Sequence, residues 1–239
     1  MSQKMETSCI SALLSKDIAY LPIKVALDNG ATLVHSKGSL MIFEELRRNA
    51  IYIVGNLADY LDGGYNVNFS KYRVAYFYDQ ELGEYFKGEY PNSSPLLGFY
   101  VFENYDRHLI DVTKGEFKVL DESYFDLVFE HYAYIGEEAT RQTLKEGRLF
   151  GLFAEDTIVG FVGLHDDKTI GMLRIFKEYQ RHGYGYALEA AINNYLVEKD
   201  QVVYCHVEED NEPSLKLQHK LGYTQSGLKQ YWLFNEESN

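Results

Sequence analysis

The stretch from Leu173 to Ala187 has the order of residue types that a diphosphate-binding loop needs. It reads Leu-Arg-Ile-Phe-Lys-Glu-Tyr-Gln-Arg-His-Gly-Tyr-Gly-Tyr-Ala, which is an apolar strand, a turn, two glycines and the start of a helix. Glycines at a first helical turn let the backbone approach a ligand closely, and unpaired amides at the positive end of the helix dipole favour an anion. One dipole interaction is worth only about 0.3–1 kcal/mol, so several amides must act together.

Basic side chains gather around this stretch, although the formal net charge of the chain is −13. They are Arg174, Lys177, Arg181, His182, Lys216, His219 and Lys220. The pattern predicts a phosphate site, with a solvated basic face as the alternative. The overall negative charge disfavours nucleic acid and anionic membranes as partners.

Hydrophobic periodicity and turn residues indicate the elements that would position this loop. The pattern predicts two helices, a three-stranded antiparallel meander, and then helix, strand, helix and strand. The expected elements are helices from Asp121 or Ser123 to Tyr132 and from Glu137 to Glu146, strands Phe150–Ala154, Ile158–Leu164 and Thr169–Phe176, helix Gly183–Glu198, strand Val202–Val207, helix Pro213–Leu221 and strand Lys229–Phe234.

The first half of the chain predicts a smaller α/β unit. Apolar residues between Ile42 and Leu61 follow a nearly helical period, which indicates one helix or two short ones. Two β-rich runs follow at 73–78 and 96–102, separated by a polar stretch from 83 to 95. Periodicity is lost between 103 and 115, so we expect a domain boundary there, with domains 1–110 and 111–239.

Composition limits the class of protein. A hydrophobic content of 46% and an aromatic content of 15% predict a folded protein. Cys9 and Cys205 are too few for a disulfide framework or a zinc cluster, so no metal is expected. The opening residues lack a secretory signal and no run of about 18 apolar residues occurs, which predicts a cytoplasmic protein without a membrane span. The oligomeric state is left open.

Two motifs resemble the GNAT superfamily of N-acetyltransferases, whose pyrophosphate loop reads [Gln/Arg]-x-x-Gly-x-[Gly/Ala]. Gln180, Gly183 and Gly185 match this loop. The second family marker, an Asn that opens the next helix and a Gly-aromatic pair at its end, is similar to Asn211 and Gly222-Tyr223. An ordinary flexible helix entry would explain the glycines alone, but both motifs occur in the family's order. The resemblance implies an α/β fold with a mixed, mostly antiparallel sheet flanked by helices.

The resemblance also implies a co-substrate, acetyl-CoA or another acyl-CoA, whose thioester an amine attacks directly in a ternary complex. The pantetheine arm would lie along the strand before the loop, and the pyrophosphate on the loop. The donor-binding residues carried over in this way are Leu173, Arg174, Ile175, Gln180, Arg181, His182, Gly183, Tyr184, Gly185, Tyr186, Asn211, Ser214 and Gln218.

The catalytic residues of the family carry over only in part. A carboxylate base on the fourth strand corresponds to Thr169, which cannot accept a proton, whereas the fifth-strand position corresponds to His206. We therefore expect His206 to be the base, with a histidine of no catalytic role as the alternative. The family's frequent general acid, a tyrosine, is replaced by Gln218, which leaves water or another tyrosine such as Tyr223 to protonate the thiolate.

Residues 46–57 resemble the opening helix of the first domain in two-domain relatives, including glycine N-acyltransferase-like proteins. This half contains no pyrophosphate loop, so we expect a degenerate GNAT-like half that shapes an acceptor cleft for a small amine or amino acid. Two other functions remain open. One is a non-catalytic acyl-CoA-binding or sensor module, and the other is a structural or interaction protein.

Overall fold

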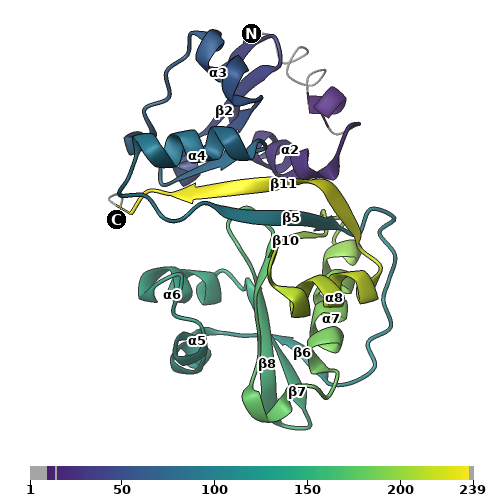
Figure 1. Cartoon of the computed structure of the whole chain (residues 1–239). Coiled ribbons are helices and arrows are strands. Elements are labelled where there is room, and N and C mark those ends of the chain that lie inside the picture. Colours follow the sequence, from purple (N-terminus) through teal and green to yellow (C-terminus); the bar gives the residue numbers. More distant parts are fainter. Residues whose placement is uncertain (1–9, 14, 237–239) are drawn as a thin grey trace. The chain divides into compact units, whose positions relative to one another are not determined.

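The computed structural model describes residues 10–13 and 15–236. They form two compact units, and neither is continuous in sequence (Figure 1). The first unit contains the described residues up to 101, together with 207–211 and those from 225 onward. The second unit contains 102–206 and 212–224. A single division at residue 110 therefore does not separate these units, because two segments of the C-terminal half belong to the first one.

The first unit contains a mixed sheet covered by helices. Its strands, in spatial order, are β1 (Thr32–Lys37), β2 (Leu40–Glu45), β3 (Ala50–Val54), β4 (Val74–Phe77), β11 (Thr224–Phe234) and β5 (Leu97–Glu103). The helices are α2 (Leu21–Asp28), α3 (Leu57–Gly63) and α4 (Gln80–Glu89). Strands β3 and β4 run parallel, whereas β1 with β2, β2 with β3 and β4 with β11 are antiparallel.

The prediction of one helix or two short ones between Ile42 and Leu61 is wrong. This region contains strand β2, a short 3₁₀ turn, strand β3 and only then helix α3. All five residues of β3 are buried, so its sequence, Ala-Ile-Tyr-Ile-Val, is a continuous apolar run of β-branched and aromatic residues. The resemblance of residues 46–57 to an opening helix therefore fails. The polar stretch from residue 83 also proves partly helical, because α4 covers Gln80–Glu89.

The second unit has the element order predicted from the sequence as far as its last helix, with one strand added at the start. The final predicted strand is part of β11, which belongs mainly to the first unit. In spatial order its strands are β10 (Tyr204–Glu208), β9 (Ile170–Ile175), β8 (Thr157–Leu164), β7 (Leu149–Ala154) and β6 (Glu116–Val119), and its helices are α5 (Phe125–His131), α6 (Glu137–Lys145), α7 (Tyr184–Glu198) and α8 (Glu212–Leu221). Strand β6 was not predicted. It is short and largely exposed, with the pattern Glu-Phe-Lys-Val, and it pairs antiparallel with β7.

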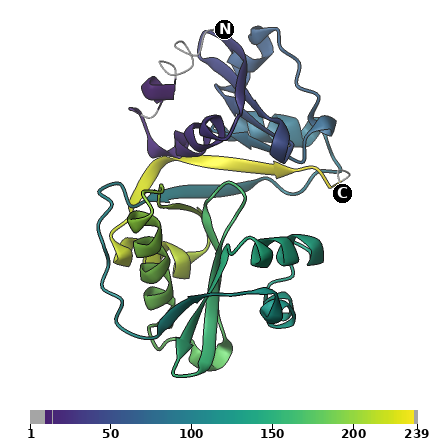
Figure 2. The ribbon, with the colours of Figure 1, turned by 180° about the vertical axis from the view of Figure 1, so that it is seen from behind.

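Helices lie on both faces of this second sheet. Figures 1 and 2 show α5 and α6 on one side of the strands and α7 and α8 on the other. The side with α5 is closed by a buried cluster that includes Leu120, Val128, Leu149 and Phe161. On the other side, Ala187, Leu188, Ala190, Ile192 and Leu196 of α7 are buried, in keeping with its contacts to β7, β8 and β9. The fold class expected from the sequence, an α/β fold with a mostly antiparallel open sheet, is confirmed.

Gly160 allows β8 to lie close against the end of β9. A Cβ atom there would meet the carbonyl oxygen of Arg174 and lie 3.0 Å from the Cα of Ile175. Both neighbours are backbone atoms, so they cannot move away as a side chain would. Glycine is therefore required by the approach of the two strands.

Replacing this glycine should disturb β9 and destabilise the chain. We expect Gly160→Ala to lower the free energy of unfolding by about 1–3 kcal/mol, the usual cost of overpacking. Urea denaturation of the full chain measures it. The matched control is Gly88→Ala in α4, where a Cβ would meet nothing within 4 Å. Because alanine favours helix, this control should be neutral or slightly stabilising. Equal stability of the two variants would contradict the packing argument.

Candidate functional site

The loop between β9 and α7 reverses the chain with left-handed backbone at two places. Arg181 has a φ of 61° and Gly183 a φ of 84°. No side chain caps α7 at Gly183, and the amide of Ala187 donates to the Gly183 carbonyl at 3.1 Å. By helix geometry the amides of residues 184–186 have no partner within the helix. The start of α7 thus offers backbone donors to a ligand.

Gln180 fixes this loop to the strand before it. Its Nε2 donates to the carbonyl oxygen of Ile175 at 3.0 Å. The following residues, Arg181 and His182, are exposed, and Tyr184, Gly185 and Tyr186 are half-buried. The first motif is therefore an ordered connection between β9 and α7 with exposed basic side chains.

Lys114 adds a cation to the loop that the sequence analysis did not identify. Its Nζ donates to the carbonyl oxygen of His182 at 2.5 Å and lies 5.1 Å from the centre of the Tyr184 ring. A Cβ atom on Gly183 would lie 3.6 Å from the same Nζ. This positive charge lies next to the helix end whose dipole is already positive, an arrangement that an anion would stabilise.

The segment that carries Lys114 is held along α7 by an asparagine. The amide of Ile110 donates to Asn194 Oδ1 at 2.8 Å, and Asn194 Nδ2 donates to the Ile110 carbonyl at 2.7 Å. Asn194 lies ten residues, or about 15 Å, beyond the start of α7. Four extended residues from Ile110 cover about 13 Å, which brings Lys114 to the helix start.

Two of the predicted basic side chains are engaged by other groups. Arg174 Nε donates to the carbonyl oxygen of His131 at 3.1 Å, so its side chain is directed to the end of α5. Lys216 forms an exposed i,i+4 ion pair with Glu212 at 2.8 Å. Lys220 does lie near the first turn of α7, with its Nζ 4.8 Å from the centre of the Tyr186 ring.

Strands β9 and β10 separate soon after they meet. They pair in parallel, and in the described part of the chain the register joins only Cys205 to Ile170. Met172 in β9 has a φ of 53°, and the register of β8 against β9 shifts between Phe161 and Gly163. The half-buried residues Leu173 and Ile175 therefore lie in β9 beyond the paired position.

His206 follows the paired Cys205 directly. It is half-buried, and its ring centre lies 5.9 Å from that of Tyr204. The histidine that the sequence analysis selected thus occupies the point at which β10 leaves β9.

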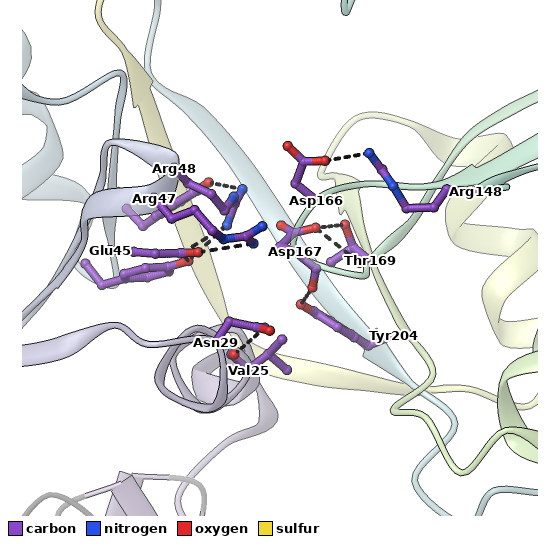
Figure 3. A network of polar contacts seen from close by, with 12 residues as sticks. Val25, Asn29, Glu45, Arg47, Arg48, Arg148, Asp166, Asp167, Thr169 and Tyr204 are labelled. Atoms are coloured by element: carbon purple, nitrogen blue, oxygen red, sulfur yellow. Dashed lines mark hydrogen bonds and ion pairs between the residues drawn. The ribbon is translucent and has the colours of Figure 1, made fainter. Parts of the chain in front are cut away.

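The turn between β8 and β9 is closed by its own polar groups (Figure 3). Asp167 Oδ1 accepts hydrogen bonds from the amide of Thr169 at 3.1 Å and from its hydroxyl at 2.6 Å. Tyr204 donates to the Asp167 carbonyl at 2.9 Å, and Arg148 pairs with Asp166 at 2.8 Å. Thr169 is buried in this arrangement, and its hydroxyl is used as a donor.

The second motif places its residues in different environments. Asn211 is exposed just before α8, Ser214 is half-buried in the first turn, and Gln218 is only 3% exposed. Gly222, with a φ of 83°, ends the helix, and the amide of Tyr223 donates to the Gln218 carbonyl at 3.1 Å. Gln218 is thus buried rather than exposed to solvent.

Gln218 forms a buried pair with a carboxyl group on α7. Its Nε2 donates to Glu189 Oε1 at 2.5 Å, and Glu189 is 2% exposed. Burial raises the pKa of Glu189 to about 7, and the Gln218 hydrogen bond opposes part of this rise. At neutral pH this group is therefore divided between the neutral and ionised forms.

A network of neutral polar groups lies around this pair. Tyr223 donates to Asn193 Oδ1 at 3.0 Å, and Asn104 Nδ2 donates to the same oxygen at 2.7 Å. Burial raises the pKa of Tyr223 and of the free thiol of Cys205 well above their usual values, and Glu189 adds to both shifts. Both groups are therefore neutral at physiological pH.

Comparisons with known proteins match this domain and its fold. The Acetyltransferase (GNAT) family matches residues 108–223. A Drosophila protein of known structure is 14% identical, with a TM-score of 0.61, over 82% of this chain and 80% of that one. A GCN5-related N-acetyltransferase from Kribbella flavida is 10% identical, with a TM-score of 0.55, over 92% and 94%. One from Sphaerobacter thermophilus is 12% identical, with a TM-score of 0.52, over 85% and 79%. No curated protein matches the chain in sequence.

The second unit thus has the fold and motif order of an acyl-CoA-dependent transferase. Residues 108–223 form a domain of the GNAT acetyltransferase family. At the level of the family, this means acyl transfer with acetyl-CoA as co-substrate. Within residues 10–13 and 15–236 there is no helix long and apolar enough to cross a membrane, and no group of three or more potential metal ligands.

Two residues of this site, Lys114 and Glu189, were missed in the sequence. Lys114 is separated from the loop by nearly 70 residues, so only the fold brings them together. The sequence around Glu189 does contain a signal that could have identified this residue. It is a single carboxyl group within the apolar run Ala187-Leu188-Glu189-Ala190-Ala191, which predicts either a partner or a raised pKa.

The raised pKa of Glu189 predicts that the folded state becomes less stable as the pH rises. The folded state holds this proton up to about pH 7, whereas the unfolded state releases it near 4.5. The free energy of unfolding should therefore decrease by about 3 kcal/mol between these values. Urea titrations at several pH values should show that Glu189→Gln removes this decrease. The exposed Glu198→Gln, on the same helix, should retain it. The pKa assignment is wrong if both variants follow the wild-type profile.

Proposed function

We propose that the chain is an N-acyltransferase, most simply an N-acetyltransferase, that moves an acyl group from acyl-CoA to a small amine or amino acid. The observation that carries this proposal is the uncapped start of α7, with Gly183 in left-handed backbone, directly after a strand that has separated from its neighbour. The donor would be held by its pyrophosphate at residues 180–186 and by its pantetheine arm along Leu173, Arg174 and Ile175.

Three groups of contacts would hold the donor. The backbone amides at the start of α7 would bind the pyrophosphate, and Lys114 and Arg181 would add positive charge. The separated edge of β9 offers backbone groups to the amides of a pantetheine arm, as an added strand would use them. Arg174 would contribute through its backbone, because its side chain contacts His131.

His206 is our candidate for the base that deprotonates the acceptor amine. It lies where β10 leaves β9, and an imidazole can accept a proton near neutral pH. The attack would form the amide bond and break the thioester C–S bond, and the departing thiolate would then take a proton. Gln218 has no proton to give, and Tyr223 donates to Asn193 within a buried network. Water is therefore the proton source we propose.

The net charge of −13 favours a cationic acceptor over an anionic one. A small amine is protonated in solution, so it would be attracted before it loses a proton to a base. This supports an amine or amino acid acceptor rather than a polyphosphate or nucleic acid. The family match does not favour the alternative of a non-catalytic acyl-CoA sensor.

A negative charge at Gly183 should weaken donor binding. Asp and Asn both tolerate left-handed backbone, so Gly183→Asp and Gly183→Asn differ mainly in charge. We expect Gly183→Asp to weaken CoA binding at least about tenfold more than Gly183→Asn, because a carboxylate would repel the pyrophosphate. Calorimetric titration with CoA measures both. Unaltered binding by Gly183→Asp would remove the loop from the donor site.

Removing the imidazole should slow turnover without affecting the donor. We expect His206→Ala to reduce kcat about 10²- to 10⁴-fold, the usual contribution of a general base, while the Kd for CoA stays within about twofold. The pH profile provides the second readout, since the acidic limb of kcat/KM should disappear. Thiol release from acetyl-CoA, measured with a panel of small amines, supplies the assay. If His206→Ala keeps the wild-type rate and profile, the base lies elsewhere.

A further inference from the structure

Glu189 and Gln218 connect the two helices that carry the family motifs. Glu189 lies in the second turn of α7, just after the loop, and Gln218 lies in α8, which opens at Asn211. Their hydrogen bond, from Gln218 Nε2 to Glu189 Oε1, is buried. Any change in this pair therefore affects the position of one motif relative to the other.

Each member of the pair has one further buried oxygen. Glu189 Oε2 and Gln218 Oε1 are both inaccessible and have no hydrogen-bond partner in the described part of the chain. With an ionised Glu189 both atoms are acceptors, and burying two unsatisfied acceptors is costly. A protonated Glu189 has one O–H to donate, and Gln218 Oε1 is an amide carbonyl oxygen that can accept it. The two unsatisfied atoms can thus satisfy each other through a single proton.

The ionisable groups around Glu189 provide no compensating positive charge. Cys205 and Tyr223 are neutral, because burial raises the pKa of each. Strands β7 and β8 contain no ionisable residue, and Arg174 of β9 contacts His131. The charged or titratable side chains of α8 have other contacts: Lys216 with Glu212, Lys220 with Tyr186, and His219 with Phe102. An ionised Glu189 would therefore be a buried charge without a cation.

We propose that Glu189 is a positioning residue of the donor site, which as a neutral acid forms two hydrogen bonds with the amide of Gln218 and so holds α8 against α7. In this pair Glu189 Oε1 accepts from Gln218 Nε2, and the Glu189 hydroxyl donates to Gln218 Oε1. The proposal depends on the donor site described under Proposed function. It adds a pH-dependent element to that site.

Ionisation would weaken donor binding in two ways. It breaks the second hydrogen bond, which loosens α8 against α7. It also places a negative charge five residues, or about 7.5 Å, behind the helix start that binds the pyrophosphate. Because burial raises the pKa of Glu189 to about 7, the change falls within the physiological range. The Kd for CoA should therefore rise with pH above neutrality.

The test is the pH dependence of CoA binding to the full chain. Calorimetric titrations from pH 6 to 8.5 should show wild-type affinity falling about tenfold, the size of one net hydrogen bond. Glu189→Gln keeps one donor and one acceptor at every pH, so its Kd should stay close to the wild-type value at pH 6. Glu189→Leu, which removes both hydrogen bonds, should bind weakly throughout. Glu198→Gln, which keeps Glu189, should follow the wild type, and any pH dependence that remains in Glu189→Gln reports the titration of CoA itself.

Infrared spectroscopy of the wild type gives an independent readout that does not require a variant to fold. A protonated carboxyl C=O band should be present at pH 6 and disappear as the pH passes 7. If the band is absent at pH 6, or if Glu189→Gln shows the wild-type pH dependence, Glu189 has no such role. If no form of the chain binds CoA at any pH, the proposed function itself fails, which is a different outcome.

Discussion

The burial of helix α7 is the constraint on which the second unit depends. Its apolar side chains, among them Leu188, Ile192 and Leu196, are fully buried, and the helix contacts β7, β8 and β9. This packing fixes where the helix begins, which is directly after β9 and its turn. Because the first turn is uncapped by side chains, the same packing that stabilises the unit also presents backbone amides for a ligand. Stability and binding thus arise from one helix.

The sequence predicted the second unit well because its signals are local. The apolar runs of β7, β8 and β9, the glycines before α7 and the Gly222 stop after α8 each lie within a short stretch of chain. The loop residues Gln180, Gly183 and Gly185 could be recognised for the same reason, and the family match supports the motif order.

Other features could not be read from the sequence because tertiary contacts decide them. Residues 42–61 have apolar positions compatible with a helix, but pairing with neighbouring strands selects β2 and β3. The contact of Lys114 with the loop depends on Asn194 holding a distant segment along α7. Gln218 was expected to bind the donor, yet its amide is bonded to Glu189, which only the packing of α7 and α8 brings near.

The discontinuous units have a practical consequence for dissecting the chain. Strand β11, at the C-terminal end, belongs mainly to the first unit, where it pairs with β4 from Val74↔Phe234 to Phe77↔Tyr231. A fragment made by one cut near residue 110 would therefore retain this 11-residue strand without β4 and β5. Its backbone donors and acceptors would be exposed on both edges, and such strands promote aggregation. Insolubility of a C-terminal fragment would reflect the severed sheet rather than an unstable catalytic fold.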